Sequence, residues 1–259
     1  MALHVIERPP LQEGPANRAV VVLVHGSLDR ANSFRRVAAR LPDASVISYD
    51  RRGYARSVEV PPTPSFARQV DDLLEVIGAR RVVGVGHSLG GDVVLSAAQR
   101  HPELLRAAMV FEPPQPWLPS SSERSAGSPA VLALGQEDAA GAAEMFMRRM
   151  IGDQSWERLP AATRESRRAE GAALVAELQA LRSTGPVFNA GRINVPVVCG
   201  YGSRSRPHHK QGTQSLAAAL PRGELHCIDG SSHGAHLSHP GGFARLIRRA
   251  LDLAQGSAP

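Results

Sequence analysis

The chain has 259 residues, 42% of them hydrophobic, and carries a formal net charge of +6 at pH 7. That length and apolar content suit a single α/β domain with a sizeable core. The arginines occur as short pairs interleaved with acidic residues rather than as one basic stripe with aromatics, so nucleic-acid binding is not predicted. The sequence shows no apolar run of about 18 residues and no secretory signal at its start, so we expect a cytoplasmic protein without membrane contact.

Strand-like and helix-like segments alternate along the first part of the chain. In order, the sequence predicts a strand at 19–24, a helix at 31–41, a strand at 45–50, a helix at 66–78, a strand at 81–85, a helix at 91–98 and a strand at 107–111. Such alternation predicts a mostly parallel, doubly wound sheet with helices on both faces, which is the α/β class.

Between residues 113 and 194 this order is interrupted. The segment starts with a Pro/Ser-rich stretch and continues through helix-like stretches, and a structureless loop of this length is not expected inside a compact domain. We therefore expect a helical cap at 113–194 over a core domain made of residues 1–112 and 195–259. Within the cap, Trp117 and Phe146 are predicted to bind an apolar acyl group, with ordinary helix–sheet packing as the alternative for each.

Two further strands, at 195–199 and 225–228, and a helix at 243–253 close the chain. Cys199 and Cys227 fall in these strands, and two lone cysteines provide no disulfide framework or metal set. Both are expected to be buried as small apolar side chains.

The sequence Gly-His-Ser-Leu-Gly at 86–90 stands between a predicted strand and a predicted helix. A Gly-x-Ser-x-Gly in that context is typical of a nucleophile elbow, a strained turn that projects the serine hydroxyl clear of the backbone. The glycines are needed because a Cβ at either position would collide with a neighbouring element. We predict that Ser88 is a nucleophile, the alternative being a structural turn.

A serine hydroxyl needs a neighbouring base with a pKa near the working pH, which histidine supplies. Among ten histidines, His233 lies in a Gly/Ser loop between the last predicted strand and helix, at the sheet edge where active sites of open parallel sheets collect. His236 and His239 follow at spacings of three, but no carboxylate or cysteine accompanies them at ligand spacing, so no metal site is predicted. Structural or solvated roles are expected for the others near the motifs: His25, His87, His208 and His209.

Together, four motifs resemble the α/β-hydrolase fold superfamily: Leu-Val-His-Gly-Ser at 23–27, Tyr-Asp-Arg-Arg-Gly-Tyr-Ala-Arg-Ser at 49–57, the elbow, and the Gly/Ser/His loop at 230–240. The second departs from the usual pattern by carrying Ala55 where glycine is common. The resemblance implies an α/β-hydrolase fold with a helical cap inserted after the sixth strand. It also implies an oxyanion hole made by the backbone N–H groups of Ser27 and Leu89.

The third member of the implied triad departs from the commonest pattern. Most members of the superfamily place an aspartate after the seventh strand, but residues 200–206 contain no carboxylate. The superfamily's alternative is an acid at the end of the sixth strand, where Glu112 stands, and the order Ser88, Glu112, His233 keeps the expected sequence of roles. Three options remain open: an ion pair of Glu112 with an arginine at the cap hinge, and Asp138 or Asp229 as the acid.

These features predict a serine hydrolase that cleaves a carboxylic ester or thioester of a small-to-medium apolar acyl substrate through an acyl-enzyme at Ser88, with no cofactor. The resemblance also covers dehalogenases and epoxide hydrolases, but these use an aspartate nucleophile and are disfavoured by Ser88. An acyltransferase or other non-hydrolytic tailoring enzyme, and a ligand receptor on the same fold, remain as alternatives. A small-molecule acyl substrate is the partner expected, and the oligomeric state is left open.

Overall fold

A seven-stranded sheet forms the centre of the computed structural model, which describes residues 2–14, 19–118, 127–183 and 185–256. The strand order is β1-β3-β2-β4-β5-β6-β7, and β1 is antiparallel to β3 whereas the other neighbours are parallel. The strand bounds are β1 Val5–Arg8, β2 Val20–Val24, β3 Ser45–Tyr49, β4 Val82–His87, β5 Leu105–Phe111, β6 Val197–Gly202 and β7 Gly223–Ile228.

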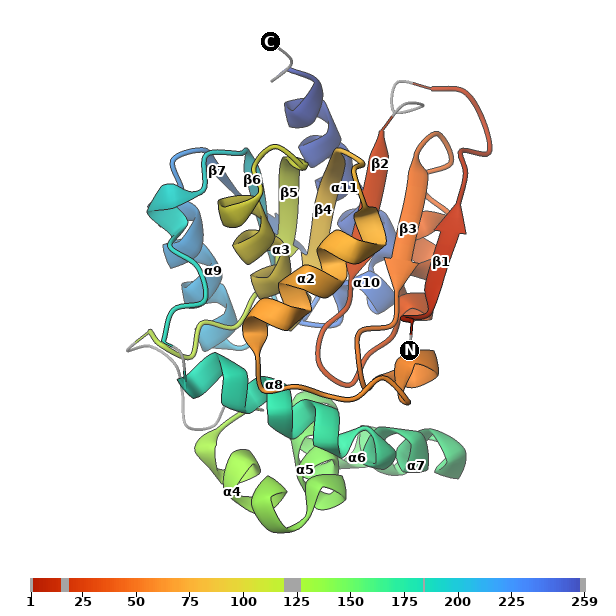
Figure 1. Cartoon of the computed structure of the whole chain (residues 1–259), viewed down its shortest axis with the longest axis vertical. Coiled ribbons are helices and arrows are strands. Elements are labelled where there is room, and N and C mark those ends of the chain that lie inside the picture. The colour runs from red at the N-terminus through yellow and green to blue at the C-terminus, as the bar shows by residue number, and fades with distance from the viewer. Residues whose placement is uncertain (1, 15–18, 119–126, 184, 257–259) are drawn as a thin grey trace.

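Helices cover both faces of this sheet, because the central strands are apolar on both sides. One apolar cluster joins one sheet face to α2 Phe66–Ile77, α3 Leu89–Arg100 and α9 Pro207–Ala219, which lie in front of the sheet in Figure 1. A second cluster joins the other face to η1 Ala31–Phe34, α1 Arg35–Ala38, α10 Ala235–Ser238 and α11 Pro240–Gln255. The predicted α/β class and doubly wound sheet are confirmed.

A helical insert follows β5 and precedes β6, the position that the superfamily resemblance counts as after its sixth strand. It contains α4 Pro129–Glu137, α5 Ala139–Ile151, α6 Asp153–Glu157, α7 Ala161–Ala169 and α8 Gly171–Ser183, grouped beyond one edge of the sheet in Figure 1. Helices α4, α5 and α8 share an apolar cluster that includes Val131, Phe146 and Leu174, and Leu28 and Tyr54 of the sheet domain join it. The insert therefore has a local core as well as contacts with the sheet domain.

Helix α8 joins the insert to that domain. Its Leu181 belongs to the apolar cluster on the sheet face that carries α2 and α3. Nearby, Glu177 accepts a hydrogen bond from Arg51 over 2.8 Å, and both side chains of this ion pair are buried. Breaking a buried pair by removing one partner leaves an uncompensated charge, so α8 is held firmly against the sheet domain.

The structure differs from the sequence-based expectations at several elements. The helix predicted at 31–41 is a 3₁₀ turn followed by the single α-helical turn of α1. Strand β1, helix α9 and the turns η2 Ala55–Ser57 and η3 Ala190–Arg192 were not predicted. Cys199 is buried, but Cys227 is exposed because β7 is an edge strand, so the expectation for Cys227 is wrong. Within the described ranges, no helix is both long and apolar enough to cross a bilayer.

Candidate active site

Ser88 occupies a sharp turn between β4 and α3, with φ 52° and ψ −130°. This left-handed conformation is strained for a residue with a side chain and points its hydroxyl away from the sheet. A Cβ at Gly86 would collide with the Gly90 carbonyl, and a Cβ at Gly90 with the Val24 carbonyl, so both glycines are required for close packing. The Ser88 N–H donates to the Phe111 carbonyl over 2.9 Å and ties the turn to β5.

Glu112 lies next to His233, although the two residues are far apart in the sequence. The Glu112 carboxylate is fully buried and accepts two hydrogen bonds, from the Gly202 N–H over 2.8 Å and from His233 Nδ1 over 2.7 Å. Because Nδ1–H donates to the carboxylate, Nε2 of the neutral imidazole carries the free lone pair. The ring therefore has the tautomer that a general base requires.

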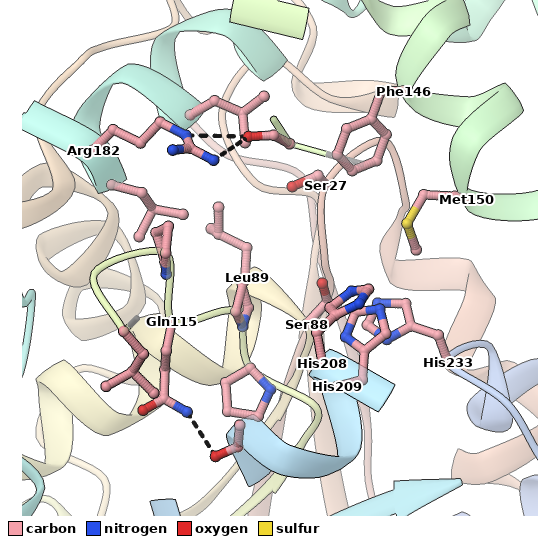
Figure 2. A pocket seen from close by; sticks show the side chains of 18 residues that line it. Ser27, Ser88, Leu89, Gln115, Phe146, Met150, Arg182, His208, His209 and His233 are labelled. Carbon is pink, nitrogen blue, oxygen red and sulfur yellow. Dashed lines mark hydrogen bonds between the residues drawn. The ribbon is translucent and has the colours of Figure 1, made fainter. Parts of the chain in front are cut away.

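Ser88 and His233 line the same cavity, which has a volume of about 100 Å³ and is called the inner cavity here. In Figure 2 the Ser88 hydroxyl lies beside the imidazole rings of His208, His209 and His233. No hydrogen bond joins Ser88 to His233 in this structure. Looser contacts of this kind are common where no substrate is bound, and they tighten when the reacting complex forms.

Ser27 and Leu89 also line the inner cavity. Leu89 is the first residue of α3, and the first N–H groups of a helix have no partner within it. The positive end of the helix dipole favours an anion at that point. The two residues whose N–H groups are predicted as oxyanion donors thus line the same cavity as Ser88.

His25 holds the loop that carries Ser27. Its Nδ1–H donates to the Gly26 carbonyl over 2.7 Å, and its Nε2 accepts from the Arg51 N–H over 2.8 Å. Burial, followed by the nearby charge of Arg51, lowers the pKa of His25 to about 3. The ring is therefore neutral at physiological pH and serves as a fixed hydrogen-bond bridge beneath the loop.

The remaining wall of the inner cavity is mostly apolar. The insert contributes Phe146, Met150, Leu178 and Leu181, and the segment after β5 contributes several prolines. Phe146, one of the two residues predicted to bind the acyl group, lines this wall and is labelled in Figure 2.

Trp117, the other residue predicted to bind the acyl group, is not among the described residues that line this cavity. It packs edge-on against Phe188 with ring centroids 5.5 Å apart and contacts the apolar cluster of the sheet domain. The expectation that Trp117 binds the acyl group is therefore corrected, because its indole covers the core at the start of the insert.

An outer cavity of about 630 Å³ adjoins the same catalytic candidates. It shares Ser27, Ser88, Phe146 and His233 with the inner cavity. Its further walls come from the end of β4, the loops after β2, β6 and β7, and helices α5, α7 and α10. They include Asp29, His87, His236, Arg167, Arg204 and Arg206.

Five imidazole rings form a continuous row through the site, in the order His208, His209, His233, His87 and His236; His209 and His233 are stacked, and the other neighbours are tilted against each other. Successive ring centroids are 4.2, 4.3, 4.7 and 4.2 Å apart. Burial first, and neighbouring positive charge second, lower the pKa values of His87, His208 and His209, so these three rings are neutral near pH 7. His87 Nε2–H also donates to the His233 carbonyl over 2.8 Å and so holds the loop of the catalytic candidate.

Sequence reasoning missed this row of imidazoles because its members come from separate elements. His208 and His209 were expected to be structural or solvated, yet both line the inner cavity from the start of α9. The available signal was the pair itself, placed just after the loop that follows the strand at 197–202. Since the parallel strands end at one edge of the sheet, residues after each strand converge there.

Two triplets bring three potential metal-ligand atoms within 4.8 Å of one another: Asp29, His87 and His236, and Glu112, His209 and His233. The carboxylates come from distant parts of the chain, which spacing in the sequence did not reveal. In each triplet the carboxylate already pairs with an imidazole, His236 Nε2 with Asp29 over 3.1 Å and His233 Nδ1 with Glu112 over 2.7 Å. These hydrogen bonds account for both arrangements, and a cation at either triplet would have to replace one.

Comparison with known sequences identifies the family of the chain. Residues 21–246 match the protein family described as the Alpha/beta hydrolase family. A 2-succinyl-6-hydroxy-2,4-cyclohexadiene-1-carboxylate synthase of Serratia proteamaculans is 27% identical over 262 residues, covering 93% of this chain and 96% of that protein. The lipase LipV of Mycobacterium tuberculosis is 31% identical over 102 residues, which cover 39% of each chain.

Solved structures show the same fold. An esterase from Thermogutta terrifontis superposes with a TM-score of 0.74 at 19% identity, covering 97% of this chain and 93% of that one. An enol-lactonase from Burkholderia xenovorans has a TM-score of 0.74 at 19% identity and covers 96% of both chains. At this level of identity, the likeness concerns the fold and leaves the substrate open.

Proposed function

Because the chain belongs to the alpha/beta hydrolase family, we propose that it is a serine hydrolase with Ser88, His233 and Glu112 as its triad. It cleaves a carboxylic ester or thioester of a small-to-medium apolar acyl substrate through an acyl-enzyme at Ser88. The observation that carries the proposal is the buried Glu112 carboxylate, 2.7 Å from His233 Nδ1, beside a cavity that also contains the Ser88 hydroxyl.

In the proposed first half-reaction, Ser88 Oγ attacks the carbonyl carbon of the substrate while His233 Nε2 takes the hydroxyl proton. Glu112 stabilises the imidazolium that forms, and it keeps the ring in the required orientation. The carbonyl oxygen becomes an oxyanion that accepts hydrogen bonds from the N–H groups of Ser27 and Leu89, each worth about 3 kcal/mol in the transition state. Collapse of this intermediate breaks the bond to the leaving group, which receives the proton from His233.

In the second half-reaction a water molecule donates a proton to His233 Nε2 and attacks the acyl-enzyme. The same N–H groups stabilise the second oxyanion, and its collapse releases the acid and returns the proton to Ser88 Oγ. The apolar wall formed by Phe146, Met150, Leu178 and Leu181 suits the acyl chain. We assign helices α4–α8, within the predicted segment 113–194, as the cap that closes over the acyl chain of the substrate.

A fluorophosphonate probe tests the nucleophile. We expect one covalent adduct, which mass spectrometry of the digested protein maps to Ser88, because an elbow serine beside an imidazole base is activated for attack. Ser88→Ala should abolish labelling and the hydrolysis of 4-nitrophenyl esters. The matched control Ser215→Ala, at an exposed position of α9, should label and turn over normally.

Labelling that survives in Ser88→Ala, or an adduct at another residue, contradicts the assignment. The products separate the remaining reaction types. Release of the free acid from an ester in plain buffer supports hydrolysis. Transfer of the acyl group to an added alcohol or amine, with little free acid, supports an acyltransferase on the same triad.

A further inference from the structure

The outer cavity has a strongly basic wall. Arg167 of α7 and two arginines of the loop after β6, Arg204 and Arg206, line it together with Ser88 and His233. That loop contains no carboxylate, and the acid beside His233 is Glu112 from the end of β5. Because this loop does not supply the acid beside His233, its arginines add positive charge next to the site without a neighbouring carboxylate of the same loop.

Little negative charge offsets these arginines. Among the described residues that line the outer cavity, Asp29 is the one carboxylate, and its Oδ2 already pairs with His236 over 3.1 Å. Arg204 and Arg206 are exposed, and the Arg206 guanidinium donates to a backbone carbonyl, that of Arg149. Both arginines thus line the outer cavity without a carboxylate partner among the described residues.

Arg167 is only partly neutralised. Its partner Glu170, 3.3 Å away, also pairs with Arg30 over 3.4 Å, so two cations share one carboxylate. Burial raises the pKa of Glu170 to about 7, so this carboxyl is partly protonated at neutral pH. The wall of the outer cavity therefore keeps a net positive charge under physiological conditions.

The inner cavity has no such group of arginines. Arg182, the one arginine among the described residues that line it, donates through Nε and Nη2 to the Gly127 carbonyl, as Figure 2 shows, and burial lowers its pKa. The rest of that wall is mostly apolar, and its volume is about 100 Å³ against about 630 Å³ for the outer cavity, whose wall combines apolar side chains with the three arginines. A substrate with its carbonyl at Ser88 would therefore have a narrow, apolar environment on one side and a wide one that contains three guanidinium groups on the other.

We propose that the substrate carries an anionic leaving group, with a carboxylate or phosphate held by Arg167, Arg204 and Arg206 in the outer cavity, and an apolar acyl group in the inner cavity. Guanidinium groups bind both kinds of anion through paired hydrogen bonds. The leaving group is assigned to the outer cavity because it departs first, and the wider space gives it a way out. The inference rests on the proposed acyl transfer at Ser88 and adds its leaving-group specificity.

Three thioesters with one acyl group test this inference. S-butanoyl-N-acetylcysteamine has a neutral leaving group, S-butanoyl-3-mercaptopropionate a carboxylate, and butanoyl-coenzyme A phosphates; a disulfide dye detects the released thiol in every case. We expect kcat/KM to be about tenfold or more higher for the anionic thioesters at low ionic strength, because a cationic cleft concentrates anions. Added salt at about 0.5 M should narrow the difference. Each compound is also measured as a competitor of 4-nitrophenyl butanoate, which reports the preference even if thioester turnover is slow.

The double variant Arg204→Gln/Arg206→Gln should reduce the ratio of anionic to neutral kcat/KM, and of the corresponding inhibition constants, by about tenfold. Arg245→Gln, an exposed arginine on α11 outside both cavities, is the matched control and should keep the wild-type ratio. A preference shared by both anionic thioesters indicates that the site accepts carboxylates as well as phosphates. A preference for the coenzyme A thioester alone indicates that the site binds a phosphate.

Equal values for neutral and anionic compounds in the wild-type protein, or an unchanged ratio in the double variant, overturn the inference and leave the acyl-enzyme at Ser88 intact. Failure of the proposed function has a different signature. In that case neither the thioesters nor 4-nitrophenyl butanoate are cleaved, and the fluorophosphonate does not label Ser88.

Discussion

At the scale of single residues, the position of Glu112 depends on one unusual backbone angle. Its φ of 48° lies in the left-handed region, and its N–H donates to the Gly200 carbonyl over 3.1 Å. The turn directs the carboxylate at the end of β5 toward the loop of His233 rather than toward solvent. Strained backbone of this kind is maintained where the surrounding contacts over-determine it, as they do around this buried acid.

We expect Glu112→Gln to lower kcat by about 10³–10⁴-fold while the fold is kept. The amide still offers an oxygen to the Gly202 N–H, but it cannot stabilise the imidazolium of His233 as a carboxylate does. Steady-state kinetics and thermal melting of the variant check this pair of outcomes.

Asp138→Asn and Asp229→Asn are the controls for this variant. Asp138 accepts from the Gly141 N–H at the start of α5, and Asp229 accepts from the Ser203 hydroxyl, so neither faces His233. Both variants should turn over substrate normally. Near-normal turnover of Glu112→Gln together with an inactive Asp138→Asn or Asp229→Asn would assign the acid to another residue.

At the scale of elements, two helices of the insert face the proposed substrate, and one of them is also anchored to the sheet domain. Helix α8 is held there by the buried Glu177 and the core residue Leu181, and its Leu178 and Leu181 line the inner cavity. Helix α5 presents Phe146 and Met150 to both cavities. A change on α5 should therefore alter substrate preference without removing a contact that anchors α8.

A matched pair of aromatic truncations tests this division. Phe146→Ala should shift the preferred acyl length of 4-nitrophenyl esters toward longer chains, because it enlarges the inner cavity. Trp117→Ala should leave that preference unchanged and lower the free energy of unfolding by about 2 kcal/mol, since it removes a partly buried side chain from the core. Urea unfolding and a 4-nitrophenyl ester series on both variants provide the measurement, and a changed chain-length preference in Trp117→Ala would contradict the placement of that indole.

At the scale of the whole molecule, buried histidines determine how stability depends on pH. Burial lowers the pKa of His25 from 6.5 to about 3 and lowers those of His87, His208 and His209. In the unfolded chain these rings bind protons below about pH 6.5, whereas in the folded protein they remain neutral. Their contribution to stability is therefore complete above about pH 6.5 and is lost as the pH falls toward the folded pKa values.

Glu170 acts in the opposite direction. Its pKa is raised to about 7, so its contribution increases as the pH falls from about 7 toward 4.5. Because one carboxyl opposes four imidazoles, the free energy of unfolding decreases on balance as the pH falls. The limiting slope is about 1.4 kcal/mol per pH unit for each net proton. We expect urea unfolding to give a lower free energy of unfolding at pH 5 than at pH 7. An equal or higher value at pH 5 would show that these imidazoles are protonated in the folded protein.

Much of the fold was predictable from local patterns. The buried strands and the amphipathic helix α2 have strong periodicity, and the elbow around Ser88 is a short motif with a steric cause. Strand β1 and helix α9 lack such a signal. The first is a short edge strand with its middle residues exposed, and the buried face of α9 has one large apolar side chain, Leu216, beside the small residues Gly212, Thr213 and Ala217.

The sequence by itself determined the fold class, the family resemblance, and the candidates Ser88, His233 and Glu112, because each depends on residues that are near one another along the chain or at the end of a recognisable strand. Only the tertiary structure decided which residues from separate elements meet: the row of five imidazoles, the arginines of the outer cavity, and the separation of Trp117 from Phe146. Parallel strands deliver their following loops to one edge of the sheet, but how those loops pack there is set by contacts between elements far apart in sequence. Local periodicity carries no information about such contacts.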